Sequence, residues 1–195
     1  MKLVERGEVL GLADYETLRE RFRARVIDEK KRRRVALGPT ASCLFENHDT
    51  VLLQIQEMLR TERITRESSV MHEIETYNQL VPADRELSAT ILVEIPEKEE
   101  RDAFLVQAAG LERSFAVIVD GERFRGKPDE SRVDAGRTTA VHYIKFPLSQ
   151  AAVDAICARG ERRAKVEVAA EHPRYTARTA LPAELVHLLA EDLAG

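Results

Sequence analysis

The stretch ELSATILVEIP, residues 86–96, alternates apolar and polar side chains and ends at a proline. A period of two residues predicts a strand with one buried face. The proline begins a helical run that stops at Gly110, a residue type that favours helix ends. The alternating run FAVIV, residues 115–119, then predicts a second strand, and Asp120-Gly121 is typical of a two-residue hairpin turn. The local order is therefore strand, helix, strand, strand.

A second stretch repeats this order later in the chain. The run TTAVHYIKFP, residues 138–147, again ends at a proline, and the helical run after it stops at Gly160. The alternating run AKVEV, residues 164–168, and a return strand complete the copy. A repeat of this length is a signal of architecture rather than of chemistry. We predict two tandem strand-helix-strand-strand repeats, residues 86–125 and 138–180, forming one mainly antiparallel sheet.

Helical periodicity dominates the chain before the first repeat. Apolar side chains recur there at helical spacing and predict three helices, over residues 15–31, 43–63 and 66–80. A C-terminal helix is predicted to begin at Pro182, and the polar segment 126–137 is predicted to link the two repeats. The fold class is therefore α+β, with a helical region over residues 1–82 and an α+β region over residues 83–195.

Composition limits the classes of function. The chain has 195 residues and a net charge of -4, which disfavours a globally basic nucleic-acid binder. No apolar run is long enough for a signal peptide or a membrane span, so we expect no membrane association. The two cysteines, Cys43 and Cys157, have no partner motif and are interpreted as reduced structural thiols. A cytoplasmic protein is predicted.

Four residues of the helical region are candidates for a metal site. His48 lies within the apolar stripe of the second predicted helix, and Glu62 lies on the same face at its far end. Glu67 on the third helix and Glu29 on the first flank the faces predicted to pack together. Imidazole and carboxylate suit iron, manganese or zinc, so one hypothesis is a divalent-metal site. The alternative is that His48 is a core residue satisfied by a carbonyl or a carboxylate.

The basic run at the end of the first predicted helix is a candidate anion site. Arg32, Arg33 and Arg34 follow two lysines there, and clustered cations bind phosphate without reading sequence. The alternative is a solvated helix end, where cations suit the negative end of the helix dipole. In that case these side chains contribute little to folding, because exposed charges are worth a fraction of a kcal/mol each.

The first strand of the second repeat also carries polar side chains. His142 shares a face with Ile144 and Phe146, whereas Tyr143 and Lys145 share the other face. If the strands of this repeat pair, His142 or Tyr143 meets residues of the return strand, Tyr175 or Arg178. The alternative is ordinary cross-strand packing with polar tips at the rim. The chain shows neither a Ser/His/Asp order nor a nucleophile elbow, so no catalytic residues are assigned.

Several segments resemble an uncharacterised family of bacterial proteins of about this length, known as domain of unknown function 3501. The most specific is Phe45-Glu46-Asn47 together with QIQEMLRTERI, residues 54–64, and residues 33–35 and 86–90 add to it. Such proteins are often encoded near rubrerythrin-like and iron–sulfur oxidoreductase proteins. The resemblance implies an accessory role in bacterial redox or oxidative-stress metabolism, with a rubrerythrin-like or iron–sulfur redox protein as the partner.

Three hypotheses of function follow. The first is a non-catalytic accessory protein that binds a partner, which fits the acidic balance and the family context. The second is a metal-binding protein or metalloenzyme that uses the His/Glu cluster on the helices. The third is a phosphate-ligand or nucleic-acid binder that uses the basic run together with the linker cations Lys127, Arg132 and Arg137.

Overall fold

The structure, a computed structural model, describes residues 1–130, 134, 136–158 and 163–195. In these ranges the strands form two antiparallel sheets. The first sheet has the order β1-β2-β3-β7-β6 and contains β1 (Arg34–Ala36), β2 (Ala41–Phe45), β3 (Glu86–Val93), β7 (Val141–Pro147) and β6 (Lys127–Pro128). The second has the order β5-β4-β8-β9 and contains β5 (Glu122–Arg125), β4 (Phe115–Val119), β8 (Val166–His172) and β9 (Tyr175–Ala180).

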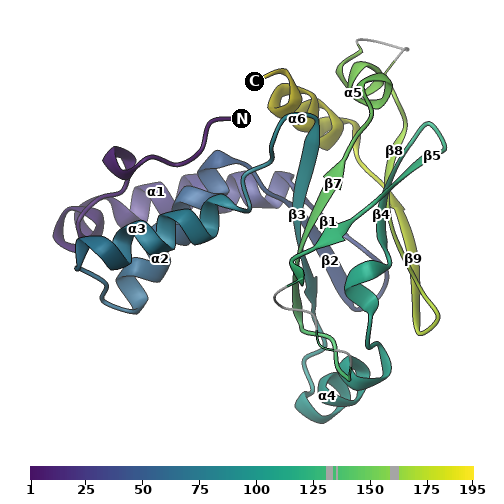
Figure 1. The fold of residues 1–195 in the computed structure, drawn as a ribbon, viewed down its shortest axis with the longest axis horizontal. Helices are drawn as coiled ribbons and strands as arrows, with labels where there is room; N and C mark the ends of the chain where they lie inside the picture. Colours follow the sequence, from purple (N-terminus) through teal and green to yellow (C-terminus); the bar gives the residue numbers. More distant parts are fainter. Residues whose placement is uncertain (131–133, 135, 159–162) are drawn as a thin grey trace.

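Helices surround the two sheets on three sides (Figure 1). Three of them form an arm beside the first sheet: α1 (Leu12–Arg32), α2 (His48–Thr61) and α3 (Glu67–Asn78). At one end of the sheets lies α4 (Lys98–Gln107), and at the other lie α5 (Gln150–Cys157) and α6 (Ala183–Ala194). Short 3-10 helices precede α1 and follow α4, namely η1 (Arg6–Glu8) and η2 (Leu111–Arg113). The α+β class, the N-terminal helices and the C-terminal helix are confirmed.

Each predicted repeat range divides between the two sheets. The first strands, β3 and β7, pair with each other in the first sheet, whereas the later strands join the second sheet through the β4–β8 pair. The single shared sheet predicted from the sequence is therefore wrong, although the order strand, helix, strand, strand occurs in both ranges. Gly110 follows α4 with a left-handed φ of 89°, while Gly160 lies outside the described residues.

The register relates the two ranges in the same way in both sheets. Ile91 pairs with His142 in the first sheet, and Val117 pairs with Val168 in the second. Both pairs join residues 51 positions apart in the chain. In each antiparallel ladder this is the one pair with that separation, so the two ranges cross at corresponding residues in both sheets.

The main core lies between the two sheets. One face of each strand enters it, as the alternation of side chains requires. Leu87, Ala89 and Ile91 of β3 therefore belong to the same buried cluster as Val117 and Val168 of the second sheet. The helices α5 and α6 cover one end of this core with buried apolar side chains. Cys43 also lies in this core as a free thiol, and burial raises its pKa well above the usual range.

The helical arm has a smaller core of its own. Side chains at helical spacing on α2 and α3 form it, namely Val51, Ile55, Leu59, Val70 and Ile74. The prediction of the third helix is confirmed. Within the described residues, no helix has the length and the apolar character that crossing a membrane requires.

The second predicted helix begins too early. Residues 41–45 form β2, which pairs with β3 along its whole length, and the helix begins only at His48. The side chain of Asn47 accepts a hydrogen bond from the backbone N–H of Thr50 and so caps the helix. A short apolar run such as ASCLF fits either a helix or a strand, and the pairing with β3 decided in favour of the strand.

The chain crosses between the sheets at Gly126. This glycine separates β5 of the second sheet from β6 of the first, within the segment predicted as a linker. A Cβ atom at this position would lie 2.4 Å from Ile144 Cγ2 and 2.9 Å from Phe146 Cε1. Only a glycine fits this close approach to β7, and the crossing places Lys127 and Asp129 beside the outer face of the first sheet.

Candidate functional site

The face of the first sheet that points away from the main core is polar. Along β3, Ser88 and Thr90 alternate with core residues and point toward the helical arm. Ser42 and Glu46 are also buried, and Glu46 Oε1 accepts a hydrogen bond of 2.5 Å from the Thr90 hydroxyl. Buried polar groups weaken a fold unless they are hydrogen-bonded, so this face is a candidate for function.

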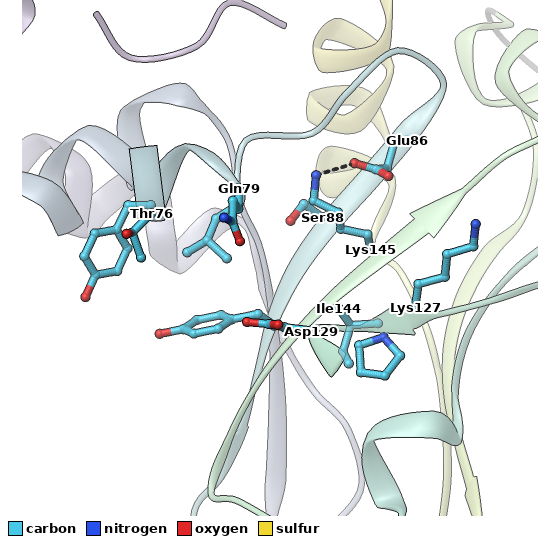
Figure 2. Close-up of a pocket in the computed structure, with 12 residues that line it drawn as sticks. Thr76, Gln79, Glu86, Ser88, Lys127, Asp129, Ile144 and Lys145 are labelled. Atoms are coloured by element: carbon cyan, nitrogen blue, oxygen red, sulfur yellow. Dashed lines mark hydrogen bonds and ion pairs between the residues drawn. The ribbon is translucent and has the colours of Figure 1, made fainter. Parts of the chain in front are cut away.

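A pocket of about 200 Å³ lies between the end of α3 and this face (Figure 2). Figure 2 shows Thr76 and Gln79 on the helical side, across from Ser88 and Lys145 on the strands. The helical wall consists of Thr76, Tyr77, Gln79 and Leu80. The sheet wall consists of Glu86, Ser88, Lys127, Pro128, Asp129, Tyr143, Ile144 and Lys145. Polar groups from four segments of the chain therefore converge on one small space.

Ser88 is the most informative residue of this pocket. Its side chain is only 2% exposed, and its backbone pairs directly opposite Lys145 of β7. The hydroxyl oxygen has no hydrogen-bond partner among the described residues. An unsatisfied buried hydroxyl costs about 1–3 kcal/mol, so the fold keeps this group at the expense of stability.

The pocket carries charges of both signs. The Lys145 ammonium group donates a hydrogen bond of 2.8 Å to Glu86 Oε1, so these two charges neutralise each other. Lys127 is exposed at the rim, next to Lys145 on the neighbouring strand. In the described part of the chain its ammonium group has no ion-pair partner. The Asp129 carboxylate also lines the pocket, so its four charged residues carry no net charge, and Lys127 is the cation at its mouth.

A smaller cavity of about 20 Å³ adjoins this pocket and shares Pro128, Asp129, Tyr143 and Ile144 with it. Glu112 of η2 and His142 of β7 complete its wall. Burial lowers the pKa of His142 to about 4, and the Glu112 carboxylate opposes that shift. The imidazole is therefore neutral at pH 7.

This buried histidine predicts a pH dependence of stability. An unfolded chain binds a proton at His142 near pH 6.5, whereas the folded chain does so only near pH 4. The unfolded state thus holds more protons between these values, so the free energy of unfolding falls as the pH drops through this window. We expect a contribution of about 3 kcal/mol. Urea unfolding of the wild type and of His142→Phe across this range measures it, and parallel curves for the two proteins would contradict it.

Three of the four residues of the predicted metal site have charged neighbours of their own, and the fourth, Glu62, is exposed. His48 is the first residue of α2 rather than the middle of a stripe, and its ring nitrogens lie 3.3 Å from Glu8 Oε1 and 3.2 Å from Asp49 Oδ1. Its side chain is partly exposed, so the expectation of a buried histidine is wrong. Glu67 pairs with Arg6, Glu29 pairs with Arg33, and Glu62 is exposed at the end of α2. No group of three or more potential ligands that could hold a metal ion occurs among the described residues.

Each of the three arginines of the basic run pairs with a carboxylate of the protein. Arg32 pairs with Glu184, Arg34 pairs with Glu94, and Arg33 contacts both Glu29 and Asp192. Arg33 is only 3% exposed, so the interpretation of the run as a solvated helix end is wrong for this residue. It joins the end of α1 to the C-terminal helix α6 instead.

The predicted contacts across the second repeat are also wrong. His142 and Tyr143 belong to the first sheet, whereas Tyr175 and Arg178 belong to the second. The Tyr175 hydroxyl donates a hydrogen bond to the carbonyl of Leu37, and Arg178 pairs with Glu167. The division of faces along residues 141–147 is confirmed, because Ile144 and Phe146 enter the core while Tyr143 and Lys145 line the pocket.

Sequence reasoning missed Ser88, Glu86 and Glu112. The polar positions of residues 86–96 did indicate that one face of this strand is hydrophilic. The same pattern describes a strand with one solvated face, so it did not reveal that α3 covers this one. Lys127, His142, Tyr143 and Lys145 were singled out, and the structure brings them together around the two cavities.

Comparisons with known proteins identify relatives but no activity. The model of a family described as Protein of unknown function (DUF3501) matches residues 3–193. A crystal structure of a novel protein of unknown function from Burkholderia pseudomallei K96243 is 31% identical in sequence and has a TM-score of 0.90. The alignment covers 98% of this chain and 100% of that chain. No curated protein matches. The resemblance inferred from residues 45–64 is thereby confirmed.

Proposed function

The chain belongs to the DUF3501 family of proteins of unknown function, and we propose that this protein binds a small anionic molecule in the pocket between α3 and the first sheet. The proposal makes it a binding protein rather than an enzyme. It moves the predicted anion site from Arg32–Arg34 to Lys127 and the buried polar face beside it.

The observation that carries the proposal is the hydroxyl of Ser88. This oxygen is buried and has no partner among the described residues, and Ser88 is one of the residues that line a pocket large enough for a small molecule. A ligand atom that hydrogen-bonds to this oxygen recovers the energy lost on burying it. A hydroxyl activated for catalysis needs a base within hydrogen-bond reach, and Ser88 has none in the described part of the chain. Binding is therefore favoured over nucleophilic chemistry.

The ammonium group of Lys127 is what favours an anionic ligand, in a pocket whose lining also includes the Asp129 carboxylate. Lys145 and Glu86 neutralise each other, whereas Lys127 at the rim offers an ammonium group. A carboxylate or phosphate placed between Lys127 and Ser88 accepts hydrogen bonds from both. The volume of about 200 Å³ is below the range typical of drug-sized ligands, which favours a compact metabolite.

The redox-partner and metal-binding hypotheses stay predictions. The redox-partner role rests on the family context, and no contact described above bears on it. It stays a prediction that purification with a partner tests. The metal hypothesis also stays a prediction, although His48, Glu62, Glu67 and Glu29 have separate environments, and metal analysis of the untagged protein tests it.

Titration with inorganic phosphate, acetate and succinate, followed by amide NMR, tests the binding proposal. We expect a saturable response confined to the amides around Ser88, Lys127 and Tyr143. Lys127→Ala and Ser88→Ala each weaken binding about tenfold, which corresponds to about 1.4 kcal/mol. Ser88→Ala also raises the free energy of unfolding of the unliganded protein by about 1 kcal/mol, because it removes an unsatisfied hydroxyl.

Lys98→Ala is the matched control, because Lys98 is an exposed lysine on α4, outside the pocket. It leaves binding unchanged if the site is correct. A response that spreads over all surface lysines, or equal affinity in the wild type and both pocket variants, would contradict the proposal. A Ser88→Ala variant that binds normally but is less stable would show that the hydroxyl is structural.

A further inference from the structure

His142 occupies a position that suits an apolar side chain. Its partner in the register is Ile91, which is completely buried in the main core and stands at the corresponding place of the first repeat range. The His142 side chain is only 4% exposed, its ring packs 5.5 Å from that of Phe115, and its neighbours Ile144 and Phe146 on the same face are core residues. A polar ring at such a position destabilises the core unless its nitrogens have partners.

Glu112 is a second buried polar side chain beside the same cavity. It is 5% exposed, and one of its carboxylate oxygens, Oε2, accepts a hydrogen bond of 2.7 Å from the Thr138 hydroxyl. The other oxygen, Oε1, has no partner among the described residues, and the same is true of His142 Nε2. Glu112 and His142 therefore each carry one unsatisfied polar atom, and both residues line one cavity of about 20 Å³.

We propose that one water molecule is bound in this cavity and bridges Glu112 Oε1 to His142 Nε2. A buried water needs about 10–15 Å³ and two or more polar partners, and the cavity provides both. Water has two O–H donors, so it donates one hydrogen bond to the carboxylate and one to an unprotonated ring nitrogen. With the other tautomer, the ring N–H donates to the water oxygen instead.

The chemistry of the cavity excludes other occupants. A volume of about 20 Å³ is too small for a metabolite. No set of three carboxylate, thiol or imidazole ligands suited to a metal ion occurs in the described part of the chain, so a metal ion would lack ligands here. The remaining candidate is a water molecule, which is a neutral hydrogen-bond donor with one heavy atom.

The internal site adjoins the ligand pocket but is independent of it. Pro128 and Ile144, paired where the short strand β6 ends, border both cavities. The strand β6 ends at Pro128, so it does not pair with the rest of β7. The bound water provides hydrogen bonds to the buried polar atoms at this uncovered edge. This inference does not require that the larger pocket bind an anion.

A high-resolution crystal structure of the full chain tests the inference directly. We expect one density peak that lies about 2.6–3.2 Å from both Glu112 Oε1 and His142 Nε2. In solution, we expect a water–protein NOE to the His142 ring protons. His142→Phe retains an aromatic ring but removes the nitrogen, and Glu112→Leu removes the carboxylate. His142→Phe loses the density peak, and Glu112→Leu loses both the peak and the NOE to the His142 ring.

Glu112→Gln provides the matched control, because the amide retains an oxygen of the same reach, so the water remains. Three outcomes would overturn the inference. The first is a direct hydrogen bond between Glu112 and His142 with no density between them. The second is a peak at the distance of about 2.0–2.2 Å that a metal ion requires. The third is a wild-type protein without a water–protein NOE at His142.

Discussion

Arg33→Ala is expected to lower the free energy of unfolding by about 3–5 kcal/mol, which is the typical cost of removing one partner of a buried ion pair. The Arg33 side chain is almost completely buried, and its two terminal nitrogens bind the two carboxylate oxygens of Asp192 at 2.5 and 3.0 Å. Its Nε donates to Glu29 as well. Without the guanidinium group, the Asp192 carboxylate loses its counter-charge, and the ion pair left to Glu29 in the described part of the chain is that of its Oε2 with Arg32 at 3.4 Å.

Urea unfolding followed by circular dichroism measures this loss, with Arg32→Ala as the matched control. Arg32 is the preceding residue, but its ion pair with Glu184 is largely exposed, so its removal costs less than about 1 kcal/mol. Equal effects for the two variants would show that Arg33 does not join α1 to α6. A second variant, Asp192→Asn, is expected to lose an amount of stability between those of the two arginine variants. It removes one charge but keeps an amide oxygen and an amide nitrogen near Arg33.

Gly126→Val is also expected to lower the free energy of unfolding, by about 1–3 kcal/mol or more, through overpacking. Even the first carbon of a side chain would lie 2.4 Å from Ile144 Cγ2 and 3.2 Å from the carbonyl oxygen of Phe115. Backbone cannot give way as a flexible side chain does. The strand β6 must therefore move away from β7, and Lys127 and Asp129 move with it.

The same unfolding measurement tests this prediction, and Gly7→Ala serves as its control. A Cβ atom added at Gly7 meets no atom within 4 Å, so this variant is expected to have nearly wild-type stability. A Gly126→Val protein of normal stability would contradict the account of the crossing. Because the variant displaces one wall of the pocket, we also expect it to lose the NMR response to phosphate and succinate.

Periodicity alone was sufficient where a segment is long and has a single interpretation. The strand over residues 86–93, the third helix and the Asp120-Gly121 turn all follow from local pattern, and φ is positive at both turn residues. The same reasoning placed Tyr143 and Lys145 on the opposite face from Ile144. It failed for residues 41–45, where a short apolar run suited either a helix or a strand.

Local sequence patterns were sufficient for the α+β class, the order of elements in the two repeat ranges and the polar face of β3, because these depend on neighbours a few residues apart. Contacts between distant segments were needed to show that the strands divide between two sheets, that Arg33 is buried against Asp192, and that Ser88 lines a covered pocket. Arg33 and Asp192 are 159 positions apart in the chain. Burial depends on which distant surfaces pack together, and a local pattern of residues describes a solvated face and a covered polar face equally well.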